Sequence, residues 1–235
     1  MGAVYKREMR AYFTSPIGYI VSAVMLFLMG LYFTYMFAQG YSDISFMFMS
    51  ISSIALLISP IITMRLFSED KKQKIDQVLL TAPVKLWKIV LGKFFAALSL
   101  FMLPFTASLF YQIIIALNKT ATVSWVMYLS NLTGMLLLGA AILSIGLFIS
   151  AMTESQIIAG IFGMVVAFFI MQIDYFASAV DSEFFSKICT YFSFINRFYA
   201  FTSGKIDFSN MVFFLSITAL FLYLTNLAMD RKRFA

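Results

Sequence analysis

The residues whose types and spacing suit chemistry gather in one charged stretch of the 235-residue chain, Arg65 to Lys93. Its Gly92-Lys93 pair resembles the end of a phosphate-binding loop, but Trp87 stands where that motif has its first glycine, and Phe94 stands where it has Ser or Thr. The chain has no histidine, the commonest general base and a frequent metal ligand. We therefore expect no catalytic, cofactor-binding or metal site in the chain.

Uncharged runs flank the charged stretch on both sides, at residues 44–64 and 94–118. Each run is long enough to cross a bilayer core of ~30 Å as a helix. The whole chain is 62% hydrophobic and 12% charged, whereas soluble domains have about 25% charged residues. The sequence therefore predicts an integral membrane protein in which residues 65–93 form a loop between two spans.

Six apolar runs predict an all-α protein with six transmembrane helices in one membrane domain, residues 1–235. The runs cover about residues 17–38, 46–64, 90–117, 125–150, 155–173 and 210–229. Thirteen basic residues fall on the side of the termini and the 65–93 loop, and four fall on the other side. The positive-inside rule then places both termini in the cytoplasm. The same rule explains the net charge of +6 better than binding to nucleic acid does.

The N-terminal segment, residues 1–16, has the pattern of a helix lying in the headgroup layer. Apolar and basic side chains fall on opposite faces, except that Glu8 falls on the apolar face. Ser15-Pro16 is expected to end this helix sharply. The alternative is a plain basic anchor that only sets topology.

The charged loop itself predicts a short helix over residues 68–81. Ser68 suits the N-cap, and Glu69 and Asp70 suit the positive end of the helix dipole. An apolar stripe follows at helical spacing, and it consists of Ile75, Val78 and Leu79. Either the lipid headgroups or a groove on a partner protein could cover this stripe.

Two further segments have distinctive patterns. Small side chains recur every fourth residue at the start of the fifth span, at Ser155, Ala159, Gly163 and Ala167. Such a stripe predicts close helix packing, either within the bundle or at a dimer interface. The connection at residues 174–209 is rich in aromatic residues, which predicts an extracytoplasmic loop on or dipping into the outer leaflet. A lid over an exit site is the alternative.

No span has a charged residue near its middle, whereas ion-coupled transporters usually carry one there. A transporter with this sequence therefore needs a partner to supply the energy. A passive channel, a membrane scaffold without transport activity and an intramembrane enzyme are the alternatives. The channel lacks rings of charge, and the enzyme lacks a histidine to pair with a serine.

Four segments carry a resemblance to a known family, at residues 5–20, 65–84, 89–94 and 198–217. The most specific is RLFSEDKKQKIDQVLLTAPV at 65–84, with its Ser-Glu-Asp-Lys cluster and its Leu-Leu-Thr-Ala-Pro turn. Over essentially its whole length the chain resembles the type 2 ABC-transporter permeases. Within them it is most similar to the gliding-motility-type permease subunit.

The resemblance implies a permease, most naturally an exporter, of the bacterial cytoplasmic membrane. A separate ABC ATP-binding subunit carries the ATP and Mg²⁺, and a second permease chain completes a homo- or heterodimer. The helix at 68–81 is then the coupling helix, residues 1–16 are the connecting helix, and short outer helices lie between spans five and six. An auxiliary membrane protein with a large outer domain is a further implied partner.

The resemblance also implies which residues meet the ATP-binding subunit. They are Ser68, Glu69, Asp70, Lys71, Ile75, Val78, Leu79, Leu80, Thr81 and Pro83. On this basis we expect Asp70→Lys, or a break in the stripe at Leu79, to uncouple ATP hydrolysis from transport while folding and insertion stay intact. A scaffold subunit of a multiprotein complex could keep the same loop, and it remains the alternative function.

Overall fold

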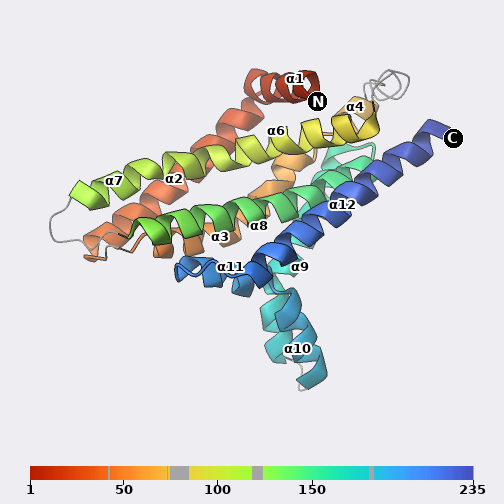
Figure 1. Ribbon diagram of the computed structural model, residues 1–235. Coiled ribbons are helices and arrows are strands. Elements are labelled where there is room, and N and C mark those ends of the chain that lie inside the picture. Colours follow the sequence, from red (N-terminus) through yellow and green to blue (C-terminus); the bar gives the residue numbers. More distant parts are fainter. Residues whose placement is uncertain (42, 73, 75–84, 118–123, 180–182, 235) are drawn as a thin grey trace.

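The computed structural model is a bundle of helices, and it describes residues 1–41, 43–72, 74, 85–117, 124–179 and 183–234. Within these residues every regular element is a helix (Figure 1). The helices are α1 Gly2–Thr14, α2 Pro16–Ala38, α3 Ser45–Thr63, α4 Ser68–Lys72, α6 Leu86–Ala107, α7 Leu109–Leu117, α8 Trp125–Met152, α9 Gln156–Ala179, α10 Glu183–Phe192, α11 Phe194–Thr202 and α12 Phe208–Phe234.

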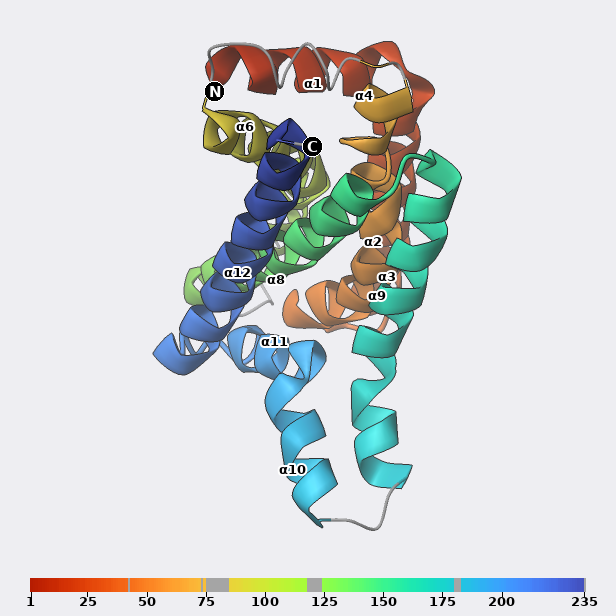
Figure 2. The ribbon, with the colours of Figure 1, turned by 90° about the vertical axis from the view of Figure 1, so that its right-hand side faces the viewer.

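Six stretches of helix in the described part of the chain are long and apolar enough to cross a membrane, which confirms the predicted fold class. They are Pro16–Ala38, Ser45–Lys72, Leu86–Leu117, Trp125–Met152, Gln156–Phe176 and Phe208–Arg231. The two ends of the chain lie at the same end of the bundle, together with α1 and α4 (Figure 2). We call this the charged end, and we call the opposite end the α10 end.

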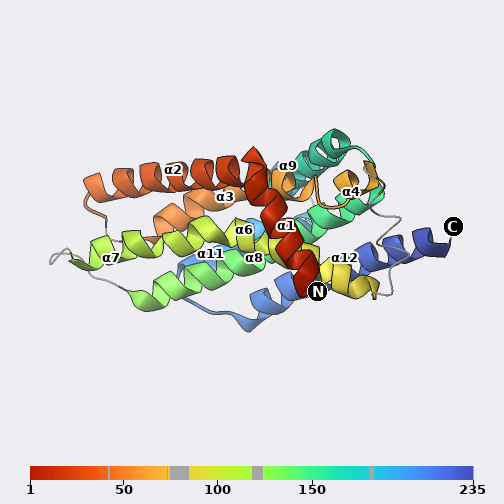
Figure 3. The ribbon, with the colours of Figure 1, turned by 90° about the horizontal axis from the view of Figure 1, so that it is seen from above.

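Helix α1 lies across the charged end and crosses over α6 (Figure 3). It stops at Thr14 because Ser15, which precedes a proline, is extended with φ −98° and ψ 157°. Pro16 then occupies the first turn of α2, where a missing N–H costs nothing. The expected break at Ser15-Pro16 is therefore confirmed, and it produces the sharp change of direction between α1 and α2.

Helix α8 is the centre of the bundle and packs against α3, α6, α9, α11 and α12. Its glycines permit this close packing. A Cβ built on Gly134 would lie 2.7 Å from Cβ of Phe201, and one on Gly146 would lie 2.9 Å from Cβ of Thr63. Both separations are too short for real side chains, so each position requires glycine.

Two spans contain a proline, and in one of them a serine replaces the lost hydrogen bond. In α3, Pro60 cannot donate to the carbonyl of Leu56, and the Ser59 hydroxyl donates to that oxygen instead at 2.8 Å. In the third span Pro104 lies just before Ser108, where the helix divides into α6 and α7. The predicted third span, which was expected to end near Leu117, is therefore present but consists of two helices.

The segment between spans five and six is more helical than a loop. Helix α9 continues past Asp174 to Ala179, and α10 and α11 follow. Helix α10 packs against the end of α9, and the pair projects from the bundle (Figures 1 and 2). The expected pair of short outer helices matches α10 and α11, although the connection begins later than the predicted residue 174.

Candidate functional site

Four charged side chains, three of them buried, join three separate helices at the charged end. Lys93 of α6 is 0% exposed, and its Nζ lies 2.9 Å from Oε1 of Glu8 in α1. The same Nζ lies 2.7 Å from Oδ2 of Asp70 in α4 and donates a hydrogen bond to the carbonyl of Leu66. Arg7 completes the group, and we call these four residues the Lys93 cluster.

Arg7 closes the cluster from the solvent side. One of its terminal nitrogens, Nη2, lies 2.5 Å from Oε1 of Glu8 and 2.9 Å from Oδ2 of Asp70. Burial would by itself lower the pKa of Arg7, but hydrogen bonds and charge attraction from Glu8 and Asp70 outweigh it and raise the pKa. Two cations and two anions thus balance in a place where an unpaired charge would be costly.

A second ion pair anchors the residues just before α4. Arg65 Nε lies 3.0 Å from Oε2 of Glu69, and Arg65 Nη1 donates to Ser15 Oγ at 2.6 Å. The guanidinium also stacks on the ring of Tyr12, with 5.3 Å between its Cζ and the ring centroid. Tyr12 in turn donates to the carbonyl of Ile62 at 2.7 Å. These contacts tie the end of α1 to the end of α3.

Helix α4 is also fixed to α8. Ser150 Oγ accepts hydrogen bonds from the backbone N–H groups of Phe67 at 3.1 Å and Ser68 at 3.2 Å. Lys71 donates to the carbonyls of Ala151 and Thr153 at the end of α8. The first turn after span two is therefore held from three directions, by α1, α6 and α8.

The structure places the first four predicted interface residues at this junction. Ser68, Asp70 and Lys71 are buried, and Glu69 is partly exposed. The remaining six lie outside the described residues: Ile75, Val78, Leu79, Leu80, Thr81 and Pro83. Of these four residues only Glu69 has a partly exposed side chain, since Asp70 is only 8% exposed.

The burial of Asp70 conflicts with our expectation that Asp70→Lys leaves folding intact. The substitution would place a third cation beside Arg7 and Lys93 and leave Glu8 as the single anion of the cluster. Removing one member of a buried ionic group is strongly destabilising. Asp70→Lys is therefore a poor test of coupling. Asp70→Asn also removes an anion, but it adds no cation and keeps the shape of the side chain, so it disturbs the cluster less.

Sequence analysis missed the roles of Glu8 and Lys93. The signal for Glu8 was present, because this carboxylate falls on the apolar face of its helix and therefore faces the protein. For Lys93 the sequence indicates only a basic residue at the end of the charged loop, in a pair that resembles a phosphate-binding motif. A lysine one residue before a long uncharged run must either reach the membrane surface or find a buried anion, and the structure shows the second outcome.

The cluster is suited to holding helices together, because its ion pairs join α1, α4 and α6. Within the described ranges, no group of three or more Cys, Asp or Glu side chains could hold a metal ion. Burial, followed by the charge of Glu8, raises the pKa of Tyr12 well above its ordinary value, so its hydroxyl stays a hydrogen-bond donor at neutral pH. The ion pairs of the cluster therefore hold α1, the start of α4 and the start of α6 together as one rigid unit.

The small-residue stripe lies elsewhere, where α9 packs on α3. Ala159 and Ala167 are buried, and a Cβ on Gly163 would lie 2.8 Å from Cβ of Pro60. Ser155 is partly exposed and lies just before α9. Of the two interpretations left open, this contact supports packing within the bundle.

Comparison with proteins of curated function gave no match. A comparison with protein families gave a match. Residues 1–182, more than half of the chain, match the model of the ABC-2 type transporter family. This region contains α1, the first five spans and the whole Lys93 cluster. The chain therefore belongs to the ABC-2 type transporter family and is a multi-pass transmembrane permease component of an ABC transporter.

Proposed function

We propose that the chain is the membrane subunit of an ATP-driven exporter and that a separate ATP-binding subunit supplies the energy. The ATP-binding subunit, which holds the ATP and Mg²⁺, docks on residues 68–81 at the cytoplasmic face. A second permease chain completes the pathway in the bacterial cytoplasmic membrane. Family membership supports this proposal, because ABC-2 permeases generally pair with an ATP-binding subunit.

The observation that carries the proposal is the Lys93 cluster. Asp70 stands in the proposed docking segment, and it is joined through Lys93 to α6 and through Arg7 to α1. Charged groups with several partners at 2.7–2.9 Å resist being pulled apart, because separation would leave a buried charge unpaired. A movement of the docking segment therefore moves α1 and the third span with it, as a rigid body.

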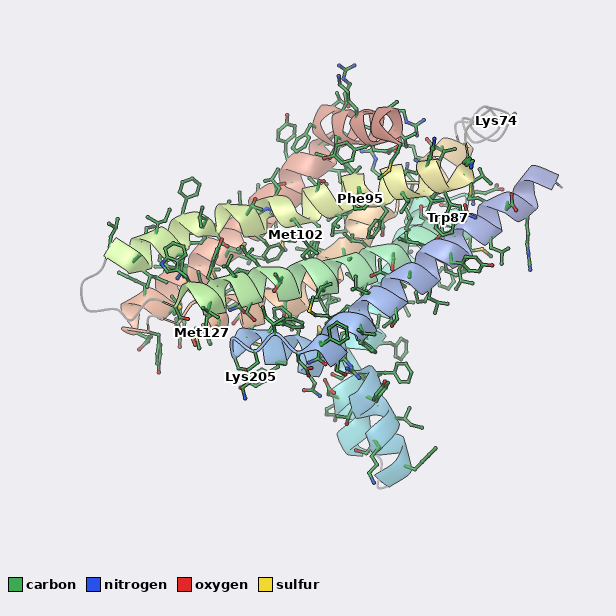
Figure 4. The ribbon with its side chains drawn as sticks, in the orientation of Figure 1. Lys74, Trp87, Phe95, Met102, Met127 and Lys205 are labelled. Carbon is green, nitrogen blue, oxygen red and sulfur yellow. The ribbon has the colours of Figure 1, made fainter. Side chains whose placement is uncertain are left out.

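Exposed residues near this junction give the docking surface a positive character. Lys72, Lys74, Lys85 and Lys88 are exposed at the charged end, and Figure 4 shows Lys74 there, above Trp87. Trp87 packs against Tyr223 of α12, with 6.3 Å between the ring centroids. The third and sixth spans thus meet next to the docking segment, so a movement received there reaches both.

Affinity purification of the tagged chain from its native membrane tests the proposal. One variant has residues 74–81 scrambled, which leaves the buried residues of α4 unchanged. A matched control has residues 118–123 scrambled, in the connection between α7 and α8. Mass spectrometry identifies the proteins that copurify, and ATP hydrolysis by the purified complex is measured.

The proposal predicts that an ATP-binding subunit copurifies with the wild type and with the 118–123 control, and that scrambling residues 74–81 removes it. Purification without any nucleotide-binding partner, or its retention in the 74–81 variant, would contradict the docking assignment. A partner that binds but hydrolyses no ATP in the complex would favour the scaffold alternative.

A further inference from the structure

A mainly apolar groove lies between α10 and α12 at the α10 end. Its walls are formed by Tyr191 and Phe192 of α10 and by residues of α12 from Phe208 to Leu220, and its volume is about 660 Å³. At 1.5 Å per residue, this part of α12 is about 18 Å long, close to the ~15 Å depth of one leaflet of the hydrocarbon core. The groove therefore has the length of a lipid acyl chain.

A cation borders this groove. The Arg197 guanidinium lies between two rings that line it, with its Cζ 4.6 Å from the centroid of Tyr191 and 4.1 Å from that of Phe213. Arg197 Nε donates to the Tyr191 carbonyl at 2.9 Å, and Nη1 donates to Asn210 Oδ1 at 2.9 Å. Arginine has five N–H donors, so donors remain for a ligand.

The charge of Arg197 is not balanced by any carboxylate in ion-pair contact among the side chains that the structure describes. The two nearby acids are engaged with neutral groups. Asp174 accepts hydrogen bonds from Ser193 and Asn196, and Asp207 accepts from the backbone of Ser209 and from Asn210. Arginine is a cation, and this one has no carboxylate partner among the described side chains, so the site is suited to binding an anion.

We propose that this groove binds an anionic phospholipid from the leaflet at the α10 end. One acyl chain lies along α12, and the lipid phosphate accepts charge-assisted hydrogen bonds from Arg197. The combination selects an anionic amphiphile. A free anion would leave the groove empty, and a zwitterionic lipid, whose ammonium offsets its phosphate, would bring no net negative charge to the guanidinium. The inference needs α12 to span the membrane, and it does not depend on an ATP-binding subunit.

Native mass spectrometry of the purified chain tests this site with two probes, phosphatidylglycerol and phosphatidylcholine of matched chain length. Arg197→Gln removes the charge. Val212→Trp fills the groove from a half-exposed wall position and leaves the contacts of Arg197 in place. Lys205→Gln is the matched control, because Lys205 is an exposed cation at the same end of the bundle (Figure 4).

The wild type and Lys205→Gln are expected to retain phosphatidylglycerol in preference to phosphatidylcholine. Arg197→Gln is expected to bind phosphatidylglycerol about tenfold more weakly, the loss typical of a hydrogen bond to a charged group. Val212→Trp is expected to weaken it as well. Equal retention of the two lipids by the wild type, or unchanged binding in either Arg197→Gln or Val212→Trp, would overturn the proposal.

Discussion

The two ends of the bundle hold their buried or half-buried cations in different ways. At the charged end, Lys93 contacts the carboxylates of Glu8 and Asp70 at 2.9 and 2.7 Å. At the α10 end, Arg197 lies between the rings of Tyr191 and Phe213, and its hydrogen bonds to the described residues go to neutral groups. The first arrangement satisfies the charge within the protein, whereas the second leaves it available.

This difference separates fixing helices from binding a ligand. A lysine paired with carboxylates on two other helices resists relative movement of the three helices, because moving them apart would leave an unpaired charge in a poorly solvating interior. Aromatic rings and amides hold a guanidinium in place and leave its net charge for an incoming anion. The charged end is therefore suited to transmitting force, and the α10 end to contacting lipid.

The largest effect is expected from Lys93→Met. The substitution keeps much of the side-chain volume but leaves Glu8 and Asp70 with Arg7 as the only cation of the cluster. We expect a loss of about 3–5 kcal/mol in stability, the usual cost of breaking a buried ion pair, measured by thermal unfolding of the purified chain in detergent. Lys88→Met on the same helix is the control, since Lys88 is exposed.

A double-mutant cycle sharpens this result. If Glu8 and Lys93 depend on each other, Glu8→Gln combined with Lys93→Met destabilises less than the sum of the two single changes, with a coupling of about 1–3 kcal/mol. Additive effects would mean that the two side chains contribute independently and that the cluster is not one unit.

Apolar packing of α9 on α3 offers another way to hold the bundle, and Gly163→Val measures it. The new side chain meets Pro60, whose position in the helix gives it little freedom, so we expect a loss of about 1–3 kcal/mol from overpacking. Gly160→Val is the matched control, because its nearest neighbour is the flexible side chain of Met64. If the two variants lower the unfolding temperature equally, the close packing made by the small-residue stripe does not lie between α9 and α3 and would have to lie elsewhere, such as at a dimer interface.

A smaller effect is expected from Tyr12→Phe, which removes one buried hydrogen bond worth about 1 kcal/mol. The pKa of Tyr12 is raised in the folded protein. The stability that the protonated Tyr12 hydroxyl contributes is therefore complete below about pH 10, the usual tyrosine pKa, and declines as the pH rises above that value. Unfolding measured from pH 8 to pH 11 should therefore show less alkaline destabilisation in Tyr12→Phe than in the wild type. Parallel pH profiles would contradict this.

The periodicity of the sequence was enough to predict the six spans, α1 and its end at Ser15, because each depends on local pattern and chain geometry. The division of the third span at Ser108 and the extension of α9 past Asp174 were not predicted. The break could not be predicted, because a serine after Pro104 is compatible with either a continuous or a broken helix. The end of α9 could not be predicted either, because Asp174 could be solvated in a loop. In the structure it instead accepts hydrogen bonds from Ser193 and Asn196.

The site was predicted only in part. The residues of the 65–93 stretch stood out by their charge, but their partners Arg7 and Glu8 are more than 60 residues away in sequence, and only the fold brings them to Asp70. The sequence pattern also predicts that Asp70 lies at the surface, because a charged residue in a loop helix is usually solvated. Its burial follows from α1 lying across the charged end (Figure 3).

The central claim is that the Lys93 cluster carries movement from the docking segment to the rest of the bundle. The most direct test uses the copurified complex in lipid vesicles, with Cys189→Ser to remove the single native cysteine and Lys205→Cys as a reporter at the α10 end. The rate of maleimide labelling is measured with and without ATP for this protein, for Asp70→Asn and for Glu69→Gln.

ATP is expected to change the labelling rate in the parent protein and in Glu69→Gln. In Asp70→Asn, ATP hydrolysis should continue while the labelling rate no longer responds to ATP, because the link from α4 to α1 and α6 is weakened. A response to ATP in Asp70→Asn equal to that of the parent would contradict the claim.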